Sequence, residues 1–168
     1  MKPINLKNQV GVNMKKILIA VDETKGTKGS FSICSKLCSC ISPEEVILVY
    51  VEKYEGRSLI NDMLGDAEMS TLKQVLEGTE YKETLDKKAN SVLDYYRKAL
   101  KSDGITSVRS EIREGHPADE ILKAAEESGA DMIMLGSRGN RISHTFMGSV
   151  SREVVNRSDI PVFVTKVK

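Results

Sequence analysis

The sequence predicts one α/β domain built around a doubly wound sheet of five parallel strands. Short apolar runs rich in β-branched residues recur along the chain, as expected for strands buried on both faces of a parallel sheet. Segments with helical spacing of apolar residues lie between these runs. This alternation favours a parallel sheet with right-handed crossovers. A chain of 168 residues is long enough for a single domain with a sizeable core.

Five segments are predicted to be strands. The first, KKILIAV, ends just before Asp22, and the second, EVILVYV, is apolar almost throughout. In the third, VRSEI, the charged residues Arg109 and Glu111 alternate with uncharged ones, so we expect them to face outward. The predicted strands are Lys15–Val21, Glu45–Val51, Val108–Ile112, Asp131–Leu135 and Pro161–Lys166.

Four segments are predicted to be helices. The first follows a glycine-containing loop, Thr24–Ser30, and continues to about Cys40. The third starts at a proline and stops at Gly129, the residue types preferred at the two ends of a helix. The other helices are expected at Glu80–Lys101, Pro117–Ser128 and Gly148–Arg157. Residues expected to face the core include Ile33, Cys34, Leu37, Cys38 and Ile41 in the first helix and Val150, Val154 and Val155 in the last.

Two segments fall outside this alternating pattern. Residues 1–13 are predicted to form a flexible N-terminal extension that precedes the domain at 14–168. Residues 52–80 contain many acidic residues and three glycines, and we interpret them as an insertion with one short helix around Met69–Leu76.

Composition and charge exclude several classes of protein. The net charge of +1 gives no basic field for nucleic acid, and no apolar run approaches the roughly 20 residues of a membrane span. The three cysteines form the pattern C-x3-C-x-C, which lacks the spacing of a metal site. We expect buried, reduced thiols at Cys34 and Cys38, and a cytoplasmic protein.

The segment Gly136–Ser149 has the residue types needed to hold phosphate. Gly136 and Gly139 allow backbone N–H groups to approach an anion closely, and Gly148 precedes a predicted helix whose first N–H groups are unpaired. Arg138 can neutralise phosphate charge or simply solvate the loop. By spacing alone, phosphate binding and a plain tight turn before a helix are equally well supported.

With its flanking sequences, this segment resembles the universal stress protein family, in its ATP-binding branch. The family motif G-x2-G-x9-G-[ST] appears here as GSRGNRISHTFMGSVS, with eight residues in the second gap, and REVVNRSDIPVFV follows. KKILIAVDE, EEVILVYV, EGHPADEIL and DMIMLGSRG extend the resemblance over nearly all of residues 14–168. The resemblance implies a Rossmann-like fold related to the adenine nucleotide α-hydrolases.

The same resemblance implies a site for ATP, with Mg²⁺ held mainly by the phosphates. Ala20 and Asp22 would lie beside the adenosine, and Thr24 would offer a hydroxyl in place of the serine common in the family. Val51 would line the adenine pocket, and Leu135 would lie just ahead of the glycine segment. Ribose and phosphates would be surrounded by Gly136, Gly139, Gly148, Ser149, Val150 and Ser151.

Three functions stay open at this stage: a nucleotide-binding stress-response protein, a slow ATP hydrolase, and a structural dimer that binds no nucleotide. No G-x-S-x-G or Walker A sequence is present, and no catalytic residue is predicted. The family resemblance implies a homodimer formed through the last strand, whose apolar edge would otherwise be exposed.

Overall fold

The computed structural model describes residues 14–52, 71, 74, 75, 77–137 and 147–166. Its five strands are parallel and lie in the order β3-β2-β1-β4-β5. This arrangement confirms the predicted five-stranded parallel sheet. The strands are β1 (Lys16–Val21), β2 (Glu45–Glu52), β3 (Val108–Glu114), β4 (Met132–Gly136) and β5 (Val162–Thr165).

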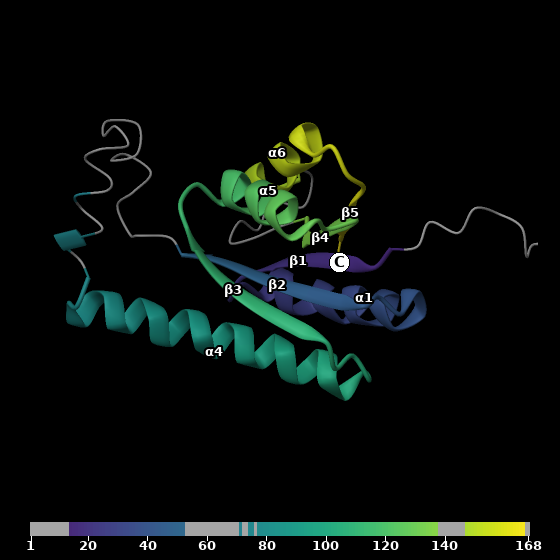
Figure 1. Cartoon of the computed structure of the whole chain (residues 1–168), viewed down its shortest axis with the longest axis horizontal. Coiled ribbons are helices and arrows are strands. Elements are labelled where there is room, and N and C mark those ends of the chain that lie inside the picture. The colour runs from purple at the N-terminus through teal and green to yellow at the C-terminus, as the bar shows by residue number, and fades with distance from the viewer. Residues whose placement is uncertain (1–13, 53–70, 72–73, 76, 138–146, 167–168) are drawn as a thin grey trace, which may run out of the picture.

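Helices cover both faces of the sheet (Figure 1). One face packs against α1 (Lys25–Ile41) and α4 (Glu80–Ser102), and its core includes Phe31, Tyr96 and Met134. The other face packs against α5 (Pro117–Ser128) and α6 (Ser149–Arg157), with Ile47, Ile121 and Val154 in its core. The central strands are therefore buried on both sides, which explains their nearly continuous apolar sequence.

Helix α1 begins earlier than the sequence predicted. The segment Thr24–Ser30 was expected to be a loop because of its two glycines, but the helix starts at Lys25. The Thr24 side chain caps it by accepting a hydrogen bond from the Thr27 N–H. Glycine disfavours a helix, and the threonine cap offsets this cost. The prediction of a loop is therefore wrong, because the helix already includes most of this segment.

The cysteines of α1 behave as predicted, but one apolar neighbour does not. Cys34 and Cys38 are buried, and burial raises the pKa of the Cys34 thiol to about 11 and that of Cys38 to about 12. Both thiols therefore stay protonated and pack as small apolar groups. Ile33 was expected in the core but is 43% exposed. Val155 of α6, also predicted to point inward, is 40% exposed.

The remaining boundaries differ from the prediction by only a few residues. Glu52, placed in the insertion by the sequence, is the last residue of β2 and is buried. Of the short helix expected around Met69–Leu76, residues 71, 74 and 75 are helical and the others lie outside the described residues. The predicted N-terminal extension, 1–13, also lies outside them.

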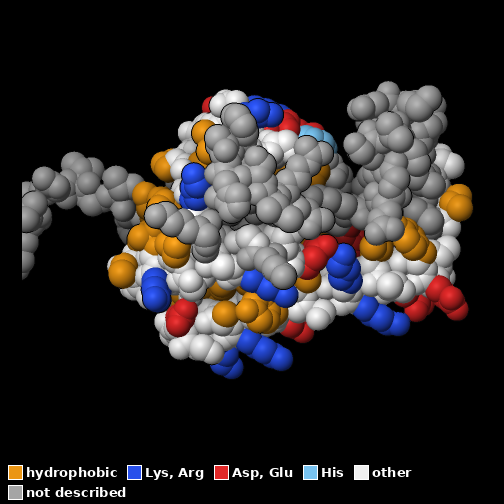
Figure 2. Space-filling model, turned by 180° about the vertical axis from the view of Figure 1, so that it is seen from behind, with side chains coloured by type: hydrophobic (Ala, Val, Ile, Leu, Met, Phe, Trp, Pro, Cys, Tyr) orange, Lys and Arg blue, Asp and Glu red, His pale blue; other side chains and the backbone are white. Residues whose placement is uncertain are grey.

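The surface carries charges of both signs. On the face shown in Figure 2, acidic and basic side chains lie near one another around smaller groups of apolar side chains. Arg109 and Glu111 of β3 form an ion pair, as do Glu111 and Arg113. Among the helices described, none is both long and apolar enough to cross a membrane.

Candidate functional site

The strand order reverses between β1 and β4. From β1 the chain passes through α1 to β2 on one side, whereas β4 and β5 extend the sheet on the other side. In open α/β sheets, ligands bind beyond the carboxyl ends of the strands at such a reversal. Asp22 follows β1 and Ser137 follows β4, so both predicted loops start at this point.

Asp22 is held in place by the start of α1 and by α4. Its Oδ1 accepts hydrogen bonds from the Thr24 N–H at 2.9 Å and from the Thr24 hydroxyl at 2.6 Å. The Tyr96 hydroxyl donates to the Asp22 carbonyl at 2.8 Å. One carboxylate oxygen is thus used to fix the turn, and Oδ2 accepts no hydrogen bond from the described residues.

The two ends of the glycine segment lie next to each other. The Gly148 N–H donates to the Ser137 carbonyl at 2.7 Å, and the Ser151 hydroxyl donates to the Gly136 carbonyl at 2.7 Å. The Ser137 N–H in turn donates to the Thr165 carbonyl of β5. These bonds anchor the start of α6 to the carboxyl end of β4. Arg138 and Gly139, predicted to contact phosphate, lie outside the described residues.

At this anchor, the first N–H groups of α6 have no acceptor among the described residues. Gly148 is the N-cap residue, and its carbonyl accepts the first helical hydrogen bond, from the Arg152 N–H. The N–H groups of Ser149, Val150 and Ser151 therefore have no acceptor within the helix. Together with the helix dipole they favour a negatively charged ligand. The Gly148 N–H is already engaged by Ser137, so it is not among these donors.

The apolar residues predicted to contact adenosine share one face of the sheet. Leu135 belongs to the core cluster on this face. The side chains packed against that cluster include Ala20, Val51 and Val150. In the register of β1 and β4, Ile19 is paired with Met134, so Ala20 comes level with Leu135. Ala20 and Val51 are partly exposed at the ends of their strands, whereas Leu135 is buried. This edge thus combines an apolar wall with a helix end whose first N–H groups have no helical acceptor.

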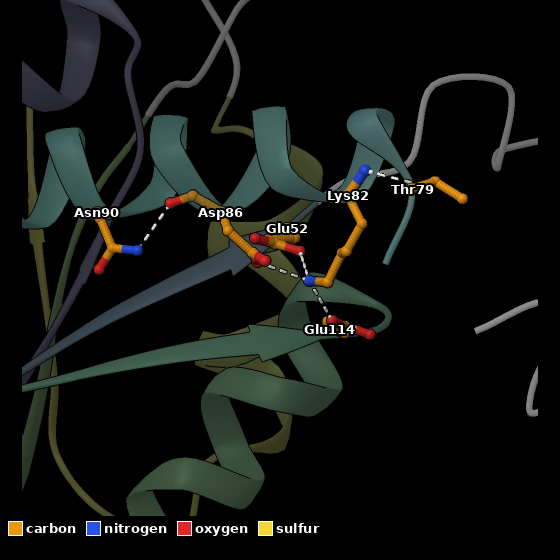
Figure 3. A network of polar contacts seen from close by, with 6 residues as sticks. All are labelled: Glu52, Thr79, Lys82, Asp86, Asn90 and Glu114. Atoms are coloured by element: carbon orange, nitrogen blue, oxygen red, sulfur yellow. Dashed lines mark hydrogen bonds and ion pairs between the residues drawn. The ribbon is translucent and has the colours of Figure 1, made fainter. Parts of the chain in front are cut away.

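An ionic network that includes the buried Glu52 lies at the same edge of the sheet, on the α4 face (Figure 3). The Lys82 ammonium contacts Glu52 Oε2 at 2.7 Å, Asp86 Oδ1 at 2.8 Å and Glu114 Oε1 at 2.6 Å. Glu52 ends β2 and Glu114 ends β3. Lys82 therefore joins the first turn of α4 to the ends of two strands. Sequence reasoning missed this network, although an acid that ends an apolar run is a usable signal.

In this network, burial and ion pairing shift the pKa values of Glu52 and Lys82 in opposite directions. Burial raises the pKa of the Glu52 carboxyl, against the lowering effect of Lys82. Glu52 is 1% exposed, and its Oε1 has no hydrogen-bond partner among the residues that the structure describes. Burial also disfavours the charged Lys82, but hydrogen bonds to Asp86, Glu114 and Glu52 raise its pKa well above the usual value. Lys82 is therefore a permanent cation that compensates three carboxylates.

A second polar group joins the β1 loop to β2 and α4. Glu23 accepts hydrogen bonds from the Tyr50 hydroxyl at 3.2 Å and from the Lys88 ammonium at 2.8 Å. Partial burial of Glu23 opposes its ionisation, but the hydrogen bond from Lys88 and other interactions hold its pKa below the usual value. Glu23 is thus ionised at neutral pH, and it helps to fix the loop that carries Asp22.

The fold and this edge define a class of protein: a doubly wound α/β domain with a candidate ligand site at its topological switch point. Residues 13–166 match the model of the universal stress protein family, and the chain belongs to this family. The universal stress protein MJ0577 of Methanocaldococcus jannaschii is 31% identical over 163 residues, which are 95% of this chain and 99% of the relative. A solved structure of MJ0577 aligns with a TM-score of 0.68, covering 94% of this chain and 99% of the other.

Two other solved structures of universal stress proteins have the same fold and are described as nucleotide complexes. One is a complex with cAMP, with a TM-score of 0.63, 15% identity, and coverage of 92% of this chain and 98% of the other. The other, from Archaeoglobus fulgidus, is a complex with dAMP, with a TM-score of 0.58, 19% identity, and coverage of 90% and 97%. At these identities the likeness shows the shared fold alone.

Proposed function

We propose that this chain is a nucleotide-binding stress-response protein that holds ATP at the carboxyl edge of β1 and β4. The observation that carries the proposal is the N-terminus of α6. The N–H groups of Ser149, Val150 and Ser151 have no acceptor within the helix. The Gly148–Ser137 and Ser151–Gly136 hydrogen bonds anchor them beside the end of β4. Phosphate is the ligand that such a helix end suits best.

The remaining residues fit the other parts of the nucleotide. Ala20 and Val51 offer partly exposed apolar surface to a base. Asp22 Oδ2 has no donor among the described residues, and the ribose hydroxyls are donors. Adenine is preferred because two solved members of the family are complexes with adenine nucleotides. Thr24 acts mainly through Asp22 and the cap of α1, and Mg²⁺ would be held mainly by the phosphates.

The test begins with the small molecules that the protein retains through purification. Mass spectrometry of the released ligand is expected to detect an adenine nucleotide at close to one per chain. A phosphate-release assay on the wild type and on Asp22→Ala then distinguishes binding from hydrolysis. We expect no turnover above background in either protein. Turnover that Asp22→Ala abolishes would make the chain a slow ATP hydrolase, and failure to bind any nucleotide would leave only the structural dimer.

We also propose that the chain forms a homodimer through β5, and Val164→Pro tests this. The Pro161 carbonyl accepts a hydrogen bond from the Ile133 N–H of β4, and the Thr165 carbonyl accepts one from Ser137, just after β4. In a parallel ladder, the N–H and C=O groups of Val162 and Val164 therefore point away from the sheet, at its edge. Proline at Val164 removes one outward N–H without touching the bonds to β4.

The expected result is a dimer mass for the wild type and a monomer mass for Val164→Pro in light scattering at micromolar concentration. Val164→Thr keeps the N–H and a branched side chain, and it is the matched control that should stay dimeric. A wild-type monomer, or a Val164→Pro protein that remains fully dimeric, would rule out pairing through this edge.

A further inference from the structure

A histidine and two carboxylates from α5 and α6 meet at the surface. These two helices lie side by side on one face of the sheet (Figure 1). His116 is the N-cap residue of α5, and Asp119 lies in the first turn of that helix. Glu153 comes from α6. Neither the fold nor the proposed nucleotide site requires this combination.

The imidazole of His116 lies between the two acids. Its Nδ1 is 3.2 Å from Asp119 Oδ2, and its Nε2 is 3.7 Å from Glu153 Oε2. The side chains of His116 and Asp119 are about half exposed, and that of Glu153 is about one-third exposed. One ligand atom from each of the three residues lies within 4.8 Å of the other two. Water can therefore reach the group and complete a coordination sphere.

Arg157 engages the opposite oxygens of the same two carboxylates. Its Nη1 is 2.6 Å from Asp119 Oδ1 and 2.6 Å from Glu153 Oε1. Oδ2 and Oε2 remain directed toward His116. The guanidinium thus orients both carboxylates from behind, as supporting hydrogen-bond donors commonly do around metal ligands. Two carboxylates and one guanidinium sum to a net charge of −1, which favours an incoming cation.

We propose that His116, Asp119 and Glu153 form a binding site for a divalent transition-metal ion, of which Zn²⁺ is the best-suited probe. One imidazole nitrogen with two carboxylate oxygens is a donor set that Zn²⁺ accepts, and water fills the fourth position of a tetrahedral site. The ion would join the start of α5 to α6 and would stabilise their packing. This site does not depend on the nucleotide.

Calorimetric titration with ZnCl₂ tests the site on the full chain, without an affinity tag and after treatment with a chelator. The titration uses a Cys40→Ser background, because Cys40 is the exposed thiol. We expect saturable binding of one Zn²⁺ per chain, and an increase of Tm on adding ZnCl₂ in the absence of nucleotide. His116→Asn is expected to weaken binding about tenfold or more. Glu153→Gln, which removes a ligand charge without changing size, should do the same.

His144→Asn is the matched control, since it replaces the only other histidine of the chain with the same residue. Its Zn²⁺ affinity should equal that of the background protein. Circular dichroism and the Tm of each metal-free variant check that the fold is retained. The proposal is overturned if ZnCl₂ shows no saturable binding up to millimolar concentration, or if His116→Asn and Glu153→Gln bind as tightly as the background. Loss of nucleotide binding would not affect either outcome.

Discussion

Replacing Lys82 with methionine should lower the free energy of unfolding by about 3 kcal/mol at pH 7. The variant keeps an unbranched side chain of nearly the same length but leaves Glu52, Asp86 and Glu114 without their shared cation. Glu52 is almost fully buried, and removing one partner of a buried ion pair strands the other charge. Chemical denaturation of the two proteins, followed by circular dichroism, measures the difference.

The difference in free energy of unfolding between the wild type and Lys82→Met should become smaller as the pH falls from 7 to 4. Lys82 lowers the pKa of Glu52, so its removal lets that pKa rise further. The folded variant then takes up protons at a higher pH than the unfolded chain does, and its stability increases as the pH falls toward the unfolded pKa. A defect of constant size across this range would show that lost packing, and not stranded charge, causes it.

Lys87→Met is the matched control for this experiment. Lys87 lies on the same helix, but its pair with Glu83 spans 3.7 Å and both side chains are well exposed. An exposed pair of this kind contributes between about 0 and 1 kcal/mol. If Lys82→Met cost no more than Lys87→Met, the network in Figure 3 would have no role in holding α4 to the ends of β2 and β3.

Ser149→Pro should weaken ATP binding by about tenfold to a hundredfold, the loss of one hydrogen bond to a charged group. Ser149 is the first residue of α6, where proline is well tolerated because its missing N–H has no helical acceptor. Gly148 has φ −59° and ψ 154°, a conformation that a following proline allows. The substitution therefore removes one N–H donor from the proposed phosphate site and leaves the helix intact.

Ser149→Ala separates the backbone donor from the hydroxyl. It keeps the N–H and removes only the side-chain oxygen, so we expect a smaller loss of affinity than with proline. Equal affinities of Ser149→Pro and the wild type, measured by calorimetry on nucleotide-free protein, would mean that phosphate does not contact the start of α6. Unchanged Tm values of the nucleotide-free proteins would show that the fold is not the cause of any loss.

Much of the fold could be predicted because buried segments have a recognisable pattern of apolar residues. Strands such as β2 are apolar throughout, since both of their faces are covered. The start of α1 could not be predicted from glycine content, because the decisive feature is the Thr24 cap. Ile33 and Val155 fit the helical spacing of a buried face, yet their side chains are 43% and 40% exposed. Apolar spacing identifies a face but not how far the covered surface extends.

The candidate site was predictable to the extent that it follows from topology. The carboxyl ends of parallel strands lie at one edge of a sheet, so Asp22 and Gly136 had to come near each other once the strands were recognised. The Lys82 network was not predictable in this way. Its lysine lies 30 residues from Glu52 and 32 from Glu114, and nothing in the local sequence pairs them. The same holds for His116 and Glu153, which meet only because α5 packs against α6.

The most direct test of a nucleotide site at the switch point is a calorimetric titration of nucleotide-free wild-type protein with ATP in the presence of Mg²⁺. We expect saturable binding with one ATP per chain, and competition by inorganic triphosphate for the phosphate part of the site. If the folded protein does not bind ATP at millimolar concentration, the proposed nucleotide site at the switch point is contradicted.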